Sequence, residues 1–264
     1  MTTILVVEGN TPDLVARALK RGDTGLAALY RSALLRLEPN LNILAVAPYE
    51  GEALVLDEVD AVAFTGSGVD WQVDDPRGAV QVRAMEQVFA AGLPVFGSCN
   101  GMQIAAHVLG GKVAASPKGP EDGLARDVTL TEAGRAHPMM AGRPERFAVP
   151  CTHRDEVCRL PDGAVLLAGN EHTPVQVFAY AQGEVDFWGV QYHPEYTPAF
   201  VARGLARYRP GTGPLQADLL ALGDDVAAAE RLGTTAEEQE DRMRMAELRN
   251  WLAHVAARAE AVAA

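Results

Sequence analysis

The stretch Leu93-Pro94-Val95-Phe96-Gly97-Ser98-Cys99-Asn100-Gly101-Met102-Gln103-Ile104-Ala105 predicts the fold of the chain around it. It reads as a short apolar strand, then a turn with glycine two residues before and two residues after a cysteine, then a helix. Such a turn is typical of a nucleophile elbow, where strained backbone projects the nucleophile above the sheet. Cys99 would lie at a helix N-terminus, whose unpaired N–H groups and dipole favour a thiolate. A buried structural cysteine is the alternative.

Strands and helices alternate along the N-terminal half of the chain. Apolar strands are expected at 4–7, 42–47 and 61–64, and apolar residues at helical spacing indicate helices over 26–37 and 80–89. This alternation predicts an α/β fold with a mostly parallel open sheet and helices on both faces. Ligands bind at the carboxyl ends of such strands, so the loops after Val7, Phe64 and Phe96 should meet at one rim.

After Lys112 the sequence pattern changes to short segments of alternating apolar and polar residues, which Gly and Pro interrupt. These segments indicate antiparallel strands that extend or flank the sheet, at 128–130, 146–149, 165–168, 175–180 and 185–190. The composition shifts again, toward Ala, Leu, Glu and Arg, after Pro210. We therefore expect one α/β domain over residues 1–209 and a C-terminal helical extension over residues 210–264.

The C-terminal extension carries a helix start and an apolar stripe. Thr235 and Glu238 have the spacing of a capping box. The stripe of the helix that would follow consists of Met245, Leu248, Leu252 and Val255. We expect this helix to pack on its own domain, and a homodimer contact through the stripe is the alternative.

Composition excludes several classes of partner. The 264 residues carry a net charge of −12, which repels phosphate backbones, so nucleic acid is not expected as a partner. Three cysteines do not make a disulfide framework, and Cys151 and Cys158 lack a zinc-site spacing, so we expect neither metal nor cofactor. The N-terminus has no basic signal region and no apolar run reaches transmembrane length, which predicts a cytoplasmic protein without membrane contact.

A second motif, His193-Pro194-Glu195, follows the expected strand at 185–190. Proline keeps the residue before it extended, and in extended chain residues two apart point to the same side. The carboxylate of Glu195 can then hold one ring nitrogen of His193 and support the imidazolium form. Together with the elbow, this motif predicts a Cys-His-Glu triad of Cys99, His193 and Glu195. A simple strand-ending turn is the alternative.

The segments Gly97–Gln103 and Gly189–Glu195 resemble the two signature motifs of class I (triad-type) glutamine amidotransferases, similar to the glutaminase domain of GMP synthase. The resemblance covers roughly residues 1 to 200 and implies a flavodoxin-like fold. It also implies hydrolysis of the glutamine side-chain amide to glutamate and ammonia through a γ-glutamyl thioester on Cys99. The ammonia would pass to a separate synthase subunit or be released.

The resemblance extends to residues that would bind the substrate or its oxyanion: Gly66, Ser67, Asn100, Gln103, Thr152, His153 and Asp155. The N–H of Asn100 and one N–H of the Gly66-Ser67-Gly68 loop would form the oxyanion hole. Gln103 resembles a substrate-contacting glutamine of the family. The segment from Thr152 to Asp155 resembles one that receives the α-amino and carboxylate groups of the substrate, with threonine where serine is usual. The alternative for this segment is a polar loop that pairs with itself.

Two further functions are compatible with the same motifs. A γ-glutamyl amide or peptide hydrolase would share the triad and have room for a larger leaving group. A regulatory or binding module with a vestigial active site is the other alternative. The substrate class expected from the sequence is therefore glutamine or a γ-glutamyl amide.

Overall fold

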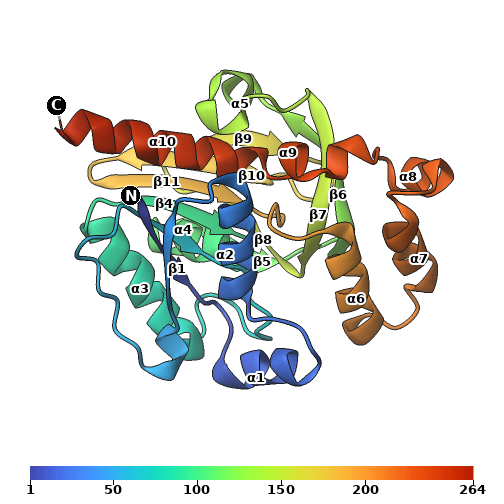
Figure 1. Cartoon of the computed structure of the whole chain (residues 1–264), viewed down its shortest axis with the longest axis horizontal. Coiled ribbons are helices and arrows are strands. Elements are labelled where there is room, and N and C mark those ends of the chain that lie inside the picture. Colours follow the sequence, from blue (N-terminus) through green and yellow to red (C-terminus); the bar gives the residue numbers. More distant parts are fainter. Residues whose placement is uncertain (264) are drawn as a thin grey trace.

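The computed structural model describes residues 1–263, with a nine-stranded sheet at its centre in the order β2-β1-β3-β4-β11-β10-β9-β6-β7 (Figure 1). The parallel half consists of β2 (Asn42–Val46), β1 (Thr3–Val7), β3 (Ala61–Phe64), β4 (Pro94–Ser98) and β11 (Val185–Val190). The antiparallel half consists of β10 (Val177–Gln182), β9 (Val165–Gly169), β6 (Glu121–Leu130) and β7 (Arg146–His153). The predicted parallel sheet with an antiparallel extension is confirmed.

The strands of the antiparallel half run further than the sequence predicts. β6 begins at Glu121 and β7 ends at His153, whereas strands were expected only at 128–130 and 146–149. The added residues include Gly123, Pro150 and several charged or polar residues, which interrupt the alternation of apolar and polar residues that predicts a strand. A separate two-stranded sheet pairs β5 (Lys112–Ala115) with β8 (Asp155–Arg159).

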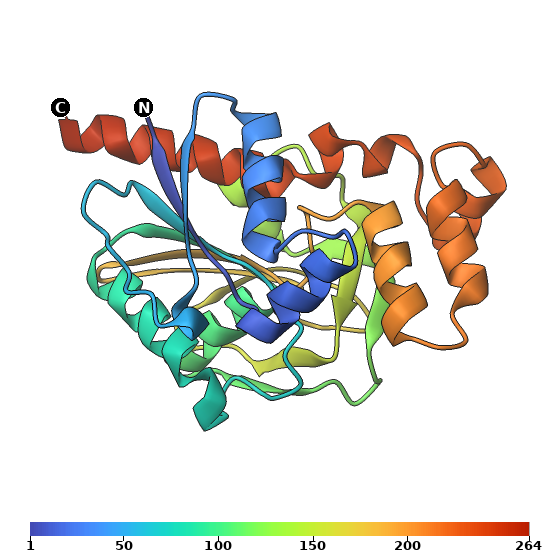
Figure 2. The ribbon, with the colours of Figure 1, turned by 60° about the horizontal axis from the view of Figure 1, so that its bottom comes forward.

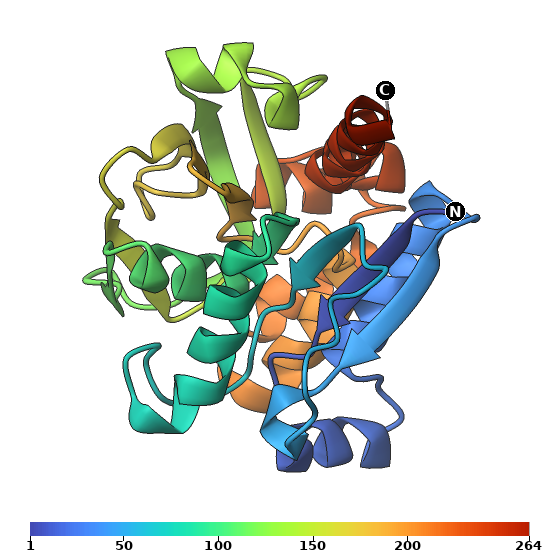
Figure 3. The same ribbon diagram turned by 90° about the vertical axis from the view of Figure 1, so that its left-hand side faces the viewer.

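Helices cover both faces of the parallel half. One face packs against α2 (Leu26–Leu37) and α10 (Ala246–Ala263), and the other against α3 (Ala79–Ala90) and α4 (Asn100–Val108), as Figures 1 and 3 show. Side chains alternate between these two layers along each strand. In β1, Ile4 and Val6 pack in the first layer, and Leu5 and Val7 in the second.

The remaining helices border the sheet. α6 (Pro198–Tyr208), α7 (Gly213–Ala221) and α8 (Val226–Leu232) pack beside β6 and β7 around Leu124 and Ala148 (Figure 2). The shorter elements are α1 (Pro12–Lys20), α5 (Glu132–Ala136), α9 (Asp241–Arg244), η1 (Pro48–Glu50), η2 (Pro76–Gly78), η3 (Pro138–Met140) and η4 (Glu237–Gln239). No helix in the described part of the chain combines the length and apolar character that crossing a bilayer requires.

The C-terminal extension differs from its prediction at its start. The N–H of Glu238 donates to Thr235 Oγ1 at 3.1 Å, as a capping box requires. However, this cap opens the short η4, and the extended backbone of Glu240 separates η4 from α9. A single helix from Thr235 is therefore wrong.

The apolar stripe of the extension is buried within the chain. Met245, Leu248 and Val255 are at most 1% exposed and share one core cluster with β1 and β4. Trp251 of α10 lies against Phe96 of β4, with ring centroids 5.7 Å apart. Packing of α10 on the chain's own sheet is thus confirmed, and the stripe is not available for the homodimer contact that was its alternative.

Candidate active site

The turn between β4 and α4 has the geometry of a nucleophile elbow. Cys99 has φ 49° and ψ −106°, a backbone conformation that residues other than glycine rarely adopt. A Cβ on Gly97 would lie 2.7 Å from the backbone of Gly101, and a Cβ on Gly101 would lie 2.6 Å from the carbonyl oxygen of Phe64. Both positions therefore require glycine, and the backbone between them projects Cys99 over the carboxyl ends of the strands.

His193 and Glu195 form a buried pair at the end of β11. His193 Nδ1 lies 2.7 Å from Glu195 Oε1, and the two residues are 2% and 4% exposed. The ring of Tyr196 stacks on the imidazole, with centroids 4.0 Å apart and planes 4° from parallel. The N–H of His193 donates to the carbonyl of Pro150 in β7 at 2.8 Å. The orientation of the imidazole is thus restricted by contacts on its ring, its Nδ1 and its backbone.

Gly66, which follows Thr65 in the loop after β3, lies against both Cys99 and His193. A Cβ on Gly66 would lie 2.6 Å from His193 Cε1 and 3.6 Å from the Cβ of Cys99. The absence of a side chain at this position lets the imidazole approach the cysteine. The structure therefore brings Cys99 together with the His193–Glu195 pair, which lies far from it in the sequence.

The charges around His193 favour its protonated form. Burial opposes the imidazolium, but the charge of Glu195 and hydrogen bonds with Cys99 and Glu195 outweigh it and raise the pKa of His193 to about 10. At neutral pH the ring is therefore charged. An imidazolium beside Cys99 stabilises negative charge on its sulfur.

Two polar side chains that the sequence analysis did not select support Glu195. Ser98 Oγ donates to Glu195 Oε2 at 3.2 Å, and the hydroxyl of Tyr30 hydrogen-bonds Ser98 Oγ. Burial raises the pKa of Tyr30 well above its ordinary value, so its hydroxyl keeps its proton. The only signal in the sequence was a serine at the end of an apolar strand. Tyr30 could not be distinguished from the other core residues of α2.

The loops after β1, β3 and β4 meet at one rim, as predicted. Ser67 Oγ donates to the carbonyl of Gly9 at 2.6 Å, and the N–H of Gly68 donates to Asn10 Oδ1 at 2.8 Å. Within residues 1–263, the N–H groups of Gly66 and Ser67 have no hydrogen-bond acceptor. The N–H of Asn100 belongs to the first turn of α4, where intrahelical acceptors are lacking. Two loops of the rim thus have N–H groups without protein acceptors close to Cys99 in the chain or in space.

Two of the residues expected to bind substrate lie beside the elbow. The carbonyl oxygen of Thr152 is 3.9 Å from Cys99 Sγ, and the Thr152 hydroxyl donates to Asp122 at 2.8 Å. Gln103 is buried on α4, and its Nε2 donates to the carbonyl of Asp155 at 2.7 Å and to Gln191 Oε1 at 3.2 Å. These contacts connect the elbow and the first turns of α4 to the end of β7 and the start of β8.

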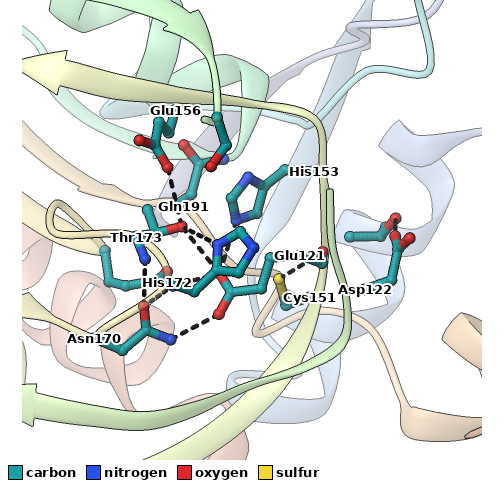
Figure 4. Close-up of polar contacts among 12 residues, drawn as sticks. Glu121, Asp122, Cys151, His153, Glu156, Asn170, His172, Thr173 and Gln191 are labelled. Carbon is teal, nitrogen blue, oxygen red and sulfur yellow. Dashed lines mark hydrogen bonds and ion pairs between the residues drawn. The ribbon is translucent and has the colours of Figure 1, made fainter. Parts of the chain in front are cut away.

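The polar groups of His153 and Asp155 already have protein partners. His153 Nε2 lies 2.9 Å from Glu121 Oε2 (Figure 4). Its Nδ1 lies 3.0 Å from the carbonyl oxygen of Asp155. The carboxylate of Asp155 accepts hydrogen bonds of 2.9 and 2.7 Å from the guanidinium of Arg154. This arrangement matches the alternative of a polar segment that pairs with itself.

Ligand atoms of Glu121, Cys151 and His153 lie within 4.8 Å of one another, which raises the question of a metal. Burial raises the pKa of Cys151 well above its ordinary value, and its Sγ donates to the carbonyl oxygen of Glu121 at 3.2 Å. Glu121 accepts hydrogen bonds of 2.7 Å from both Asn170 and Gln176 (Figure 4). The cluster is thus a hydrogen-bonded network in which each of the three groups already has a protein partner.

Comparison with known proteins agrees with this geometry. The family model of class-I glutamine amidotransferases matches residues 49–201, which include Cys99, His193 and Glu195. A γ-glutamyl-L-1-hydroxyisopropylamide hydrolase of a Pseudomonas species is 34% identical over 73% of this chain and 67% of its own length. A GMP synthase of Thermomicrobium roseum is 35% identical over 58% of this chain, which spans only 27% of that enzyme.

The fold also recurs among solved structures. A glutamine amidotransferase of Thermotoga maritima superposes with a TM-score of 0.64 at 22% identity, and the alignment covers 96% of this chain and 97% of that one. Because the family model matches more than half of the chain and the Pseudomonas relative is similar over most of its length, the family is established. The chain belongs to the class-I glutamine amidotransferases.

Proposed function

We propose that the protein hydrolyses the side-chain amide of a γ-glutamyl compound through a thioester on Cys99. The observation that carries this proposal is the charged, buried imidazole of His193, which Glu195 holds beside a cysteine on a strained elbow. An ionised sulfur with a positioned proton donor is what nucleophilic attack on an amide requires.

The reaction would proceed in two balanced steps. The thiolate of Cys99 attacks the amide carbon, the C–N bond breaks, and His193 gives its proton to the departing amine or ammonia. Water then attacks the γ-glutamyl thioester, the now neutral His193 accepts the proton of the water, and the C–S bond breaks to release glutamate. Glu195 keeps the imidazole oriented in both steps and stabilises its charged form.

The oxyanion of each tetrahedral intermediate would be bound at the rim. The N–H of Asn100 and an N–H of Gly66 or Ser67 are the donors best placed, because the N–H of Gly68 is already bonded to Asn10. Gln103 and Thr152 would form the wall nearest the substrate. His153 and Asp155 would act mainly by holding the shape of that wall, since their polar atoms are paired.

The leaving group distinguishes two candidate substrates. The Pseudomonas relative is named for a γ-glutamyl hydroxyalkylamide, and it is similar over a larger part of this chain than the GMP synthase is. This similarity favours an N-substituted γ-glutamyl amide. Free glutamine is the second candidate because it is the substrate after which the family is named. In that case a separate synthase subunit would be the acceptor of the ammonia.

The test compares free glutamine with a series of γ-glutamyl N-alkylamides, with glutamate release measured for wild type and for Cys99→Ser. We expect at least one amide to turn over, and we expect Cys99→Ser to lower kcat by about 10³-fold or more, since a hydroxyl is ionised far less than a thiol. If no amide turns over and Cys99 does not react with a glutamine-like electrophile, the chain is a binding module instead.

A further inference from the structure

The turn that carries His193 and Glu195 is held by the C-terminal extension, which lies beyond the residues matched by the family model. Arg244, the last residue of α9, is fully buried. Its Nη1 donates to the carbonyl of Tyr196 at 2.7 Å and also to the carbonyl of Pro194. One guanidinium nitrogen therefore holds two carbonyls of the catalytic turn.

The other guanidinium nitrogens of Arg244 bond to residues that are close to it in the sequence. Nε donates to the carbonyl of Gln239 at 3.3 Å, and Nη2 pairs with the carboxylate of Asp241. Asp241 also pairs with Arg36 of α2, at 2.7 Å. The planar guanidinium is thereby held in one orientation, which a lysine ammonium could not reproduce.

A second contact ties the same turn to α10. The hydroxyl of Tyr192, the residue before His193, donates to Glu247 Oε1 at 2.7 Å. Both oxygens of Glu247 accept from Arg143 at 2.7 Å, and the side chains of this ion pair are 0% exposed. Arg143 also donates to the backbone carbonyl of Arg244 at 2.9 Å. The two contacts therefore belong to one buried network.

These contacts bear on the imidazole itself. Pro194 follows His193 directly, and the ring of Tyr196 lies flat on the imidazole. A shift of either carbonyl would change the position of the ring relative to Cys99. Stability alone does not explain the network, because apolar side chains of similar volume often stabilise a core as well as a buried ion pair does.

We propose that Arg244 and Glu247 are positioning residues that fix the His193–Tyr196 turn and thereby hold the imidazole of His193 next to Cys99. The inference rests on the proposed function and gives the C-terminal extension a role in catalysis. An error of about 1 Å in the position of a catalytic group can lower the rate by about 10²-fold.

The experiment compares Arg244→Lys and Arg244→Met with Leu248→Ala. Leu248 is a buried apolar residue of α10, so its truncation destabilises α10 without removing a hydrogen bond to the turn. For each variant we would measure Tm, kcat and KM on the preferred γ-glutamyl amide, and the rate of Cys99 alkylation by iodoacetamide against pH. The alkylation rate reports the pairing of Cys99 with His193 without any substrate.

We expect kcat to fall by about 10-fold in Arg244→Lys and about 10²-fold in Arg244→Met, with KM changed by less than about 3-fold. The pH profile of Cys99 alkylation should move toward that of a free thiol. Leu248→Ala should lower Tm but keep kcat within about 2-fold and leave the alkylation profile unchanged. If folded Arg244→Met keeps the wild-type kcat and profile, or if Leu248→Ala loses activity in proportion to Tm, the proposal is overturned.

A milder variant covers the case in which Arg244→Met does not fold. Tyr192→Phe deletes one hydroxyl and leaves the ion pair of Arg143 and Glu247 in place, so the fold should survive. We expect a several-fold lower kcat and a shifted alkylation profile, and wild-type values for both would refute the proposal. If wild type hydrolyses no γ-glutamyl amide, the proposed function fails, while the alkylation profiles still decide the role of Arg244.

Discussion

Replacing Glu195 with glutamine removes the negative charge that lies 2.7 Å from His193 and nearly preserves the shape of the side chain. The pKa of His193 rises from its ordinary 6.5 to about 10 in the folded protein. That rise corresponds to a preference of roughly 5 kcal/mol for the imidazolium, because a tenfold change in proton affinity is worth ~1.4 kcal/mol. Without the carboxylate, only the contacts with Cys99 oppose the effect of burial, so the pKa of His193 should fall.

The alkylation of Cys99 by iodoacetamide, followed from pH 5 to 10, measures this change. The protein would carry Cys158→Ser, because Cys158 is exposed whereas Cys151 is buried. In wild type the imidazolium stabilises negative charge on the sulfur, so Cys99 should be alkylated rapidly at neutral pH. In Glu195→Gln alkylation at neutral pH should slow, and kcat should fall by about 10²–10⁴-fold.

A matched control is available at the other end of β11. Asp186 Oδ2 lies 2.7 Å from His254 Nε2, so Asp186→Asn removes the charge of a second carboxylate–histidine pair, away from Cys99. The control should leave the alkylation profile and kcat unchanged. An unchanged profile in Glu195→Gln, or an equal shift in Asp186→Asn, would refute the reasoning about His193.

Three other predictions concern the surroundings of the same pair. Gly66→Ala adds a methyl group 2.6 Å from His193 Cε1, so kcat should fall by about 10–10²-fold, and an unchanged kcat would show that the ring does not lie against this loop. Tyr30→Phe removes the hydroxyl beside Ser98 and should cost ~0.5–1.5 kcal/mol in denaturant unfolding. Its kcat should fall only a few-fold, and a loss equal to that of Glu195→Gln would contradict the minor role given to Tyr30. Because folded His193 keeps a proton that the unfolded chain loses near pH 6.5, its contribution to the unfolding free energy should be complete below pH 6.5 and should decline by up to ~1.4 kcal/mol per pH unit until about pH 10. This decline should flatten in Glu195→Gln, and an identical slope would contradict the assignment.

The parts of the fold that follow from side-chain alternation were predictable from the sequence. Strand β1 and helix α2 appear at the expected residues because their apolar side chains face defined layers. Helix α1 was missed because it spans only nine residues, directly follows a turn and fully buries none of its apolar side chains, such as Leu14 and Ala18. Strand β8 was missed because its polar residues pair only with β5, outside the main sheet.

The residues of the site could likewise be predicted only where neighbouring residues in the sequence determine their positions. Cys99, His193 and Glu195 were found because glycine spacing and the proline at 194 constrain the backbone locally. The supports of the site could not be found in this way, since Arg244 is 49 positions beyond Glu195 and contacts the turn only through backbone carbonyls. A hydrogen bond to a backbone carbonyl does not depend on the side chain of the partner residue, so it produces no sequence motif.

The most direct test of the central claim is to trap the covalent intermediate. Wild-type protein would be mixed with its preferred γ-glutamyl amide and quenched in acid during turnover, and the peptides would then be analysed by mass spectrometry. The account predicts one γ-glutamyl group on the peptide that contains Cys99, and neither adduct nor turnover in Cys99→Ala. An adduct on another residue, or hydrolysis that continues in Cys99→Ala, would contradict it.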